Sequence, residues 1–193
     1  SASEFVESDL TMETDTAIYV VARQAGESFD RRLEENQFLL TQIEKENIKK
    51  LAEHYDKVIL VINCGGIMDL AILDEVNNIG AVIYFVQAGT EGGNADLVTG
   101  RVTPSGRLTD TWGMDYYDYP SAETYSHING EVSYENYYEG IYVGYRWFDA
   151  KKIKARYPFG YGLSYTTFEQ ELVTIQSSGT TIELVVKVTN TGK

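Results

Sequence analysis

Three short apolar runs, rich in β-branched residues, constrain the fold of this chain more than any other feature. They are Thr16–Ala22, Lys57–Ile62 and Gly80–Val86. Their length and composition are typical of strands that are buried in a sheet. Each run is followed by a turn-like or helix-like stretch, so we expect the strands to alternate with helices.

An amphipathic helix is predicted over Thr41–Tyr55. Thr41 and Glu44 have the spacing of a capping box, in which each residue bonds the backbone of the other at the start of a helix. The apolar residues that fall close to one face of this helix are Ile43, Ile48, Leu51 and Tyr55.

Strand, helix, strand, helix, strand is the pattern of a parallel sheet covered by helices. The further helices are predicted over Met68–Asn77 and around Asn94–Thr99. Such sheets bind ligands beyond the carboxyl ends of their strands. Three segments leave those ends, and we expect a site among them: Gly26–Glu27, Asn63–Gly66 and Gln87–Gly93.

The second half of the chain differs in character. Leu108–Tyr145 contains no Lys or Arg and is rich in Tyr, which indicates a long irregular excursion. A further strand is predicted over Gly140–Phe148, an aromatic connector over Tyr157–Phe168 and a β-hairpin over Glu169–Val188. A lone hairpin is marginal in water, so we expect the chain to be a piece of a larger protein. The exposed edges of the hairpin would also allow a homodimer.

Charge and composition exclude several classes of function. The formal net charge of −13 argues against nucleic acid or an anionic membrane surface as a partner. No apolar run approaches the roughly 18–20 residues that cross a bilayer. Two histidines and one cysteine at unrelated spacings cannot form a zinc motif. The single cysteine fits a reducing, cytoplasmic compartment without excluding secretion.

Long strings of residues resemble the second half of glycoside hydrolase family 3, the β-glucosidase and β-xylosidase group. They are ARQAGESFDRR at Ala22–Arg32, EGGNADLVTGRVTPSGRLTDTW at Glu91–Trp112, YYEGIYVGYRWFD at Tyr137–Asp149 and YPFGYGLSYTTFE at Tyr157–Glu169. The resemblance covers essentially the whole chain from about Thr16 onward.

The resemblance implies an α/β fold and a multidomain parent. Residues 1–168 would form a three-layer sandwich with a mostly parallel sheet, and residues 169–193 the first strands of a fibronectin type III-like domain. A barrel domain, absent from this chain, would carry the nucleophile and most sugar contacts. The substrate would be a β-linked oligosaccharide or glycoside, cleaved with retention of configuration, and no cofactor is implied.

By motif match, Glu27 is the general acid/base. Retaining glycosidases need two carboxyl groups about 5–5.5 Å apart, one as nucleophile and one to protonate the leaving oxygen. The alternative is a surface glutamate on a loop. For Arg23, Asp30 and Arg31 we favour a structural role, an ion pair or hydrogen bonds that fix the loop, over contact with substrate.

Other residues carry weaker signals. Glu91–Gly93 and Asn63–Gly66 fit helix-entry turns better than phosphate loops, because neither has the spacing of a phosphate-binding motif. Cys64 fits a small buried residue better than a nucleophile. Trp147, Phe148 and the tyrosines of Tyr116–Tyr145 fit packing better than a sugar subsite, although a minority could approach the substrate.

Two other functions stay open. The chain could be a non-catalytic scaffold or carbohydrate-binding module that keeps the fold without the chemistry. Its parent could also be a β-xylosidase or a β-N-acetylglucosaminidase in place of a β-glucosidase.

Overall fold

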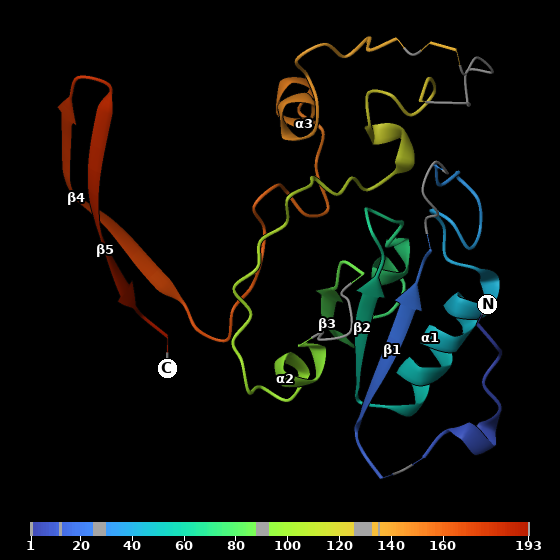
Figure 1. Cartoon of the computed structure of the whole chain (residues 1–193). Coiled ribbons are helices and arrows are strands. Elements are labelled where there is room, and N and C mark those ends of the chain that lie inside the picture. Colours follow the sequence, from blue (N-terminus) through green and yellow to red (C-terminus); the bar gives the residue numbers. More distant parts are fainter. Residues whose placement is uncertain are drawn as a thin grey trace. The chain divides into compact units, whose positions relative to one another are not determined.

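The computed structural model describes residues 2–11, 13–24, 30–87, 93–125, 133–134 and 136–192. They belong to two compact units (Figure 1). The first combines Ser1–Gly92 with Leu108–Gly160, and the second combines Gly93–Arg107 with Tyr161–Lys193. The first unit holds a parallel sheet and the second an antiparallel hairpin.

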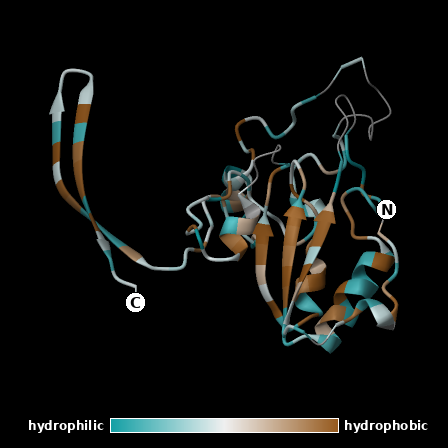
Figure 2. Ribbon diagram, turned by 60° about the horizontal axis from the view of Figure 1, so that its bottom comes forward, coloured by the Kyte–Doolittle hydropathy of each residue, from teal (hydrophilic) through white to brown (hydrophobic). Residues whose placement is uncertain are grey.

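The sheet of the first unit consists of β1 (Thr16–Ala22), β2 (Lys57–Asn63) and β3 (Ile79–Tyr84), in that order. Both pairs of neighbours are parallel, with Tyr19 opposite Leu60 and Leu60 opposite Val82. The three predicted strands are therefore confirmed, with ends that differ by two residues at most. Their apolar residues continue along the whole sheet (Figure 2).

Helix α1 (Gln42–His54) covers one face of this sheet by packing against β1 and β2. The predicted capping box is present, because Thr41 Oγ1 accepts from the Glu44 backbone and Glu44 Oε2 accepts from the Thr41 backbone. Ile48 and Leu51 reach the core, together with Tyr55 at the end of the helix. Ile43 was expected on the same face but is 39% exposed.

Polar residues occupy part of the buried side of α1. Asn47 is 1% exposed, and its side chain donates to the Ser3 carbonyl and accepts from the Phe5 backbone. The N-terminal segment thus lies across the helix and satisfies this amide. The sequence pattern of apolar residues could not reveal that contact.

The other face of the sheet is open on β1. Tyr19 and Val21 are buried, whereas Ile18 and Val20 are 50% and 55% exposed. Strands of parallel sheets are usually covered on both faces. The prediction of a buried strand over Thr16–Ala22 therefore holds for one face only.

A short 3-10 helix, η2 (Ala71–Asp74), replaces the helix predicted over Met68–Asn77. The prediction was wrong because Met68, Leu70 and Ile72 are all buried, and this spacing of two does not fit one face of an α-helix. Long-range contacts hold the segment open, since the Asp69 backbone donates to the Phe38 carbonyl.

The strand predicted over Gly140–Phe148 is also wrong. Helix α3 (Tyr145–Lys151) begins there, after Gly144 with φ of 53°. Phe148 is its buried residue, and the Trp147 indole donates to the Asp118 carbonyl. The rest of the described excursion is irregular apart from η3 (Tyr116–Asp118), as expected, and η1 (Glu7–Asp9) lies near the N-terminus.

The second unit contains α2 (Asn94–Val98) and a hairpin of β4 (Phe168–Ser178) and β5 (Thr181–Asn190). Both were predicted. Leu172 opposes Val186 and Ile175 opposes Leu184 on one face of the hairpin, whereas Glu171 pairs with Lys187 on the other. No helix in the described part of the chain is both long and apolar enough to span a bilayer.

Candidate functional site

The carboxyl edge of the parallel sheet is where the sequence predicted a site. Asn63 ends β2 and Cys64–Gly66 follow it at that edge, and Gln87 lies shortly after the end of β3 at Tyr84. Glu27, the predicted acid/base residue, lies outside the described residues, as do residues 25–29 and 88–92. The geometry of the edge is therefore given by the residues on either side of these segments.

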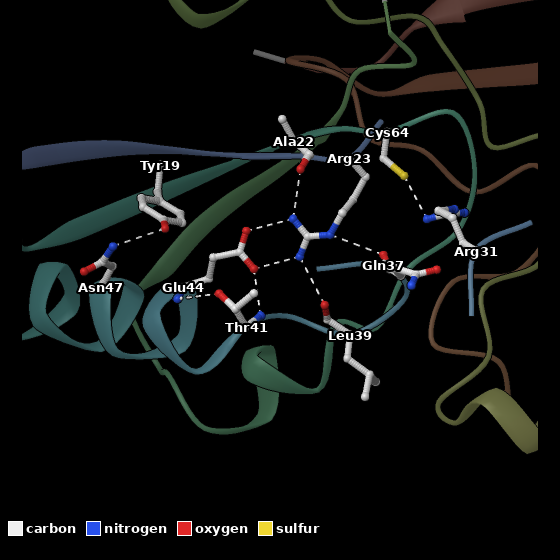
Figure 3. Close-up of polar contacts among 10 residues, drawn as sticks. All are labelled: Tyr19, Ala22, Arg23, Arg31, Gln37, Leu39, Thr41, Glu44, Asn47 and Cys64. Carbon is white, nitrogen blue, oxygen red and sulfur yellow. Dashed lines mark hydrogen bonds and ion pairs between the residues drawn. The ribbon is translucent and has the colours of Figure 1, made fainter. Parts of the chain in front are cut away.

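Arg23 directly follows β1 and is 4% exposed (Figure 3). Its two terminal nitrogens each donate to one oxygen of Glu44, both at 2.7 Å. The same guanidinium donates to the carbonyls of Ala22, Gln37 and Leu39. These hydrogen bonds all lie inside the protein, which fits the structural role predicted for Arg23.

The Glu44 carboxyl is held in its charged form. Burial alone would raise its pKa, but hydrogen bonds from Arg23 and Thr41 more than offset this effect, and the pKa lies below its ordinary value. Glu44 therefore serves both as the cap of α1 and as the counter-ion of Arg23. The capping box was predicted from the sequence, but the ion pair was not.

Arg31 follows residues 25–29, on the other side from Arg23. Its Nη1 donates to the Cys64 sulfur at 2.9 Å (Figure 3). Its Nη2 donates to the Ile67 carbonyl at 2.6 Å. Cys64 is 1% exposed, which agrees with the interpretation of a buried residue. Arg31 thus ties its segment to the turn that leaves β2.

Two further residues complete these anchors. The Gln87 side chain donates to the Arg23 carbonyl at 2.9 Å, across the end of β2. Gln87 has φ of 30°, a conformation that residues other than glycine rarely adopt. Asp30 accepts a hydrogen bond from the Tyr125 hydroxyl at 2.9 Å. Gln87 was expected only as part of a segment at this edge, not for its own contact.

A cleft of about 550 Å³ opens beside Arg31 within the first unit. Its walls combine charged, hydroxyl and aromatic side chains with exposed backbone. The lining residues are Arg31, Gly65, Gly66, Ile67, Thr109, Asp110, Thr111, Tyr119, Val143, Gly144, Tyr145, Arg146 and Phe159. A few polar groups set among aromatic and aliphatic side chains are typical of a site for a small molecule.

The aromatic residues divide between this cleft and the packing around it. Tyr145 and Phe159 line the cleft, with ring centroids 5.2 Å apart. Tyr119 lines it too, but burial raises the pKa of its hydroxyl to about 12, and this hydroxyl donates to the Thr111 carbonyl and accepts from the Gly113 backbone. Trp147 and Phe148 do not line it, in agreement with the packing role favoured for them.

Asp110 and Arg146 are charged lining residues that the sequence analysis did not name as site candidates. Neither has a spacing that marks a site, because they come together only through the fold of the irregular second half. Among the described residues, no group of three or more His, Cys, Asp or Glu is placed to hold a metal ion.

Comparison with protein families gives a match along most of the chain. The model of the glycosyl hydrolase family 3 C-terminal domain matches residues 4–165. A beta-glucosidase of Ruminococcus albus is 40% identical over 159 residues, which cover 81% of this chain and 16% of that protein. Beta-glucosidase A of Butyrivibrio fibrisolvens is 36% identical over 192 residues, covering 86% and 23%. The chain spans less than a quarter of the length of these relatives.

Solved structures give the same picture. A beta-glucosidase from Paenibacillus barengoltzii matches with a TM-score of 0.83 and 37% identity, covering 92% of this chain and 20% of that one. Beta-glucosidase 3B from Thermotoga neapolitana in complex with glucose matches with a TM-score of 0.83 and 35% identity, covering 92% and 26%.

Proposed function

This chain belongs to glycosyl hydrolase family 3, whose C-terminal domain it matches, and we propose that the whole protein is a retaining β-glycosidase acting on β-glucosides. The observation that carries the proposal is the match over residues 4–165, together with 34–40% identity to several proteins named as beta-glucosidases. The relative from Thermotoga neapolitana with glucose bound favours a glucoside over a xyloside or an N-acetylglucosaminide.

In this proposal Glu27 is the general acid/base. It would protonate the leaving oxygen in the first step and deprotonate water in the second, while a nucleophile from a barrel domain outside this chain attacks the anomeric carbon. The contacts of Arg23 and Arg31 support it, because they fix the chain on both sides of residues 25–29. A carboxyl that transfers protons needs such fixed surroundings.

The domain organisation is a proposal too. Residues 1–168 would be an α/β sandwich, in which a further layer covers the exposed face of Ile18 and Val20. Residues 169–193 would begin a fibronectin type III-like domain. The support is the apolar face of the hairpin, where Leu172, Ile175 and Leu184 are all more than half exposed.

A second candidate is a carbohydrate-binding module without chemistry. The cleft beside Arg31 favours some contact with sugars, since aromatic faces and hydroxyl-bonding groups line it. Binding without catalysis would leave the activity of the whole protein independent of Glu27.

The experiment compares this chain with the full-length protein on an aryl β-glucoside. We expect turnover by the full-length protein and none by the 193-residue chain, because the chain supplies one carboxyl group of the required pair. A full-length protein that hydrolyses a β-xyloside but no β-glucoside would overturn the substrate. Turnover by the chain alone would overturn the proposal that the nucleophile comes from a barrel domain outside this chain.

A further inference from the structure

The turn after β2 contains two neighbouring glycines, Gly65 and Gly66, at the carboxyl edge of the sheet. Neither has a positive φ. Their backbone conformation is therefore open to other residues, and it does not explain why glycine stands at both positions. The space around them does.

At Gly66 a side chain would collide with Arg31. A Cβ built on this glycine would lie 2.9 Å from Arg31 Nη2, well inside van der Waals contact. The guanidinium cannot move aside freely, because its two terminal nitrogens are bonded to the Cys64 sulfur and the Ile67 carbonyl. A side chain at residue 66 therefore requires the guanidinium to shift, and this shift weakens its hydrogen bonds to these two partners.

At Gly65 the crossing side chain is Gln87. A Cβ there would lie 3.0 Å from Gln87 Oε1, whose amide nitrogen donates to the Arg23 carbonyl. The end of a glutamine side chain can shift by a few tenths of an ångström, so this contact is softer than the one at Gly66. Because Gly65 and Gly66 have no side chains, the side chains of Gln87 and Arg31 can lie close against this turn.

We propose that the Cys64–Gly66 turn positions the segment that carries Glu27, with Gly66 and Arg31 as the positioning pair. Arg31, which follows residues 25–29, is hydrogen-bonded to Cys64 and to Ile67 beside this turn. Gln87 holds Arg23, which precedes residues 25–29, through the Arg23 carbonyl. Gly66 leaves room for the Arg31 guanidinium because it has no side chain. The inference rests on the proposed role of Glu27 and gives Gly66 and Arg31 a positioning role that acts through the segment of that residue.

The test uses Gly66→Ala in the full-length enzyme, with two aryl β-glycosides of the sugar that it hydrolyses fastest. Phenol needs a proton to leave, whereas dinitrophenol leaves without one. A misplaced acid should lower kcat/KM for the phenyl glycoside by roughly ten- to a hundredfold. The dinitrophenyl glycoside should lose much less in this first step. The inhibition constant Ki of a competitive sugar inhibitor should stay within about twofold, because the substitution displaces the acid and removes no contact with the sugar.

Three variants control this result. Gly106→Ala introduces a Cβ that meets nothing within 4 Å and should leave kcat/KM unchanged for both glycosides. Gly65→Ala should lose less than Gly66→Ala, because only the flexible end of Gln87 must move. Cys64→Ser keeps an acceptor for Arg31 and should retain more activity on the phenyl glycoside than Cys64→Ala.

A double-mutant cycle links Gly66 to Arg31. Once Arg31→Ala has removed the guanidinium, Gly66→Ala has nothing left to displace and should cause less than a twofold further loss. Losses that multiply in the double variant would overturn the pairing. If Gly66→Ala does not fold, as judged by its circular dichroism, Arg31→Lys carries the same comparison of leaving groups, because lysine cannot bond both partners in the geometry of arginine.

Failure of the inference can be told apart from failure of the proposed function. If Glu27→Gln leaves the activity on phenyl glycosides intact, the proposed function is wrong. If Glu27→Gln removes that activity but Gly66→Ala lowers both glycosides equally, Glu27 is the acid/base and the positioning inference is wrong.

Discussion

Arg23 and Glu44 form a buried ion pair in which two guanidinium nitrogens meet two carboxylate oxygens, each at 2.7 Å. The pair joins the end of β1 to the first turn of α1, because Glu44 also caps that helix through Thr41. A single carboxylate therefore connects the start of the core helix to the residue that precedes the proposed catalytic segment.

Removing the Glu44 charge should destabilise the fold. Glu44→Gln leaves Arg23 buried without its counter-ion, and breaking one partner of a buried pair costs about 3–5 kcal/mol. Urea unfolding of the chain measures the change. Glu53→Gln, at an exposed position of the same helix, is the matched control and should lie within about 0.5 kcal/mol of the parent. Equal effects of the two substitutions would contradict this role.

The same pair should make the stability of the fold depend on acid pH. The pKa of Glu44 is lowered in the folded state, so its contribution is present above the ordinary value of 4.5 and is lost as the pH falls through the folded value. Unfolding free energies of the parent should fall below about pH 4.5 more steeply than those of Glu44→Gln. Parallel curves for the two proteins would show that Glu44 is not the group responsible.

Tyr119 should govern stability at the alkaline end. Its pKa is raised from 10 to about 12, so the folded state favours the neutral phenol, and this stabilisation is lost as the pH rises from about 10 through 12. Tyr119→Phe should cost about 1 kcal/mol at neutral pH through its lost hydrogen bonds. An ultraviolet titration of Tyr119→Phe should then lack one phenol that ionises near pH 12.

How much of this structure the sequence could predict depends on the range of the contacts involved. The strands, the capping box and the hairpin were predictable because β-branched runs, the Thr41 to Glu44 spacing and alternating residues act locally. The helix over Met68–Asn77 and the strand over Gly140–Phe148 were not, because long-range contacts decide both. The Phe38 carbonyl accepts a hydrogen bond from the Asp69 backbone, and the Asp118 carbonyl accepts one from the Trp147 indole.

The candidate site shows the same division. Motifs pointed to Glu27 and to anchoring roles for Arg23 and Arg31, since those residues share one short string. Gln87 and Gly66 were expected at this edge and Glu44 as a helix cap, but their contacts with Arg23 and Arg31 join distant segments and have no signal in the sequence. Only the parallel sheet, which gathers the ends of its strands at one edge, brings them together.

The apolar face of the hairpin should promote self-association of this chain. Ile175 and Leu184 oppose each other on it and are 63% and 55% exposed. Sedimentation velocity should show oligomers growing with concentration, and Ile175→Lys with Leu184→Lys should abolish them. Gln176→Lys lies on the opposite face and should change little. A parent chain that stays monomeric at all concentrations would contradict the prediction.

The cleft should face substrate if the proposed function is right. Tyr145 lines it, whereas Tyr138 is 75% exposed and does not. In the full-length enzyme, Tyr145→Ala should raise KM for a β-linked disaccharide several-fold through the loss of stacking, with Tyr138→Ala as the control. Identical KM values for the two variants would show that Tyr145 in the cleft does not contact the substrate.

The central claim is that Glu27 is the acid/base of a retaining β-glycosidase, and Glu27→Gln in the full-length enzyme tests it most directly. We predict a loss of roughly 100-fold or more in kcat/KM for a phenyl β-glucoside. With a dinitrophenyl β-glucoside, azide should restore much of the turnover and yield the β-glucosyl azide, because an anionic nucleophile needs no base. Unchanged activity in Glu27→Gln would contradict the claim.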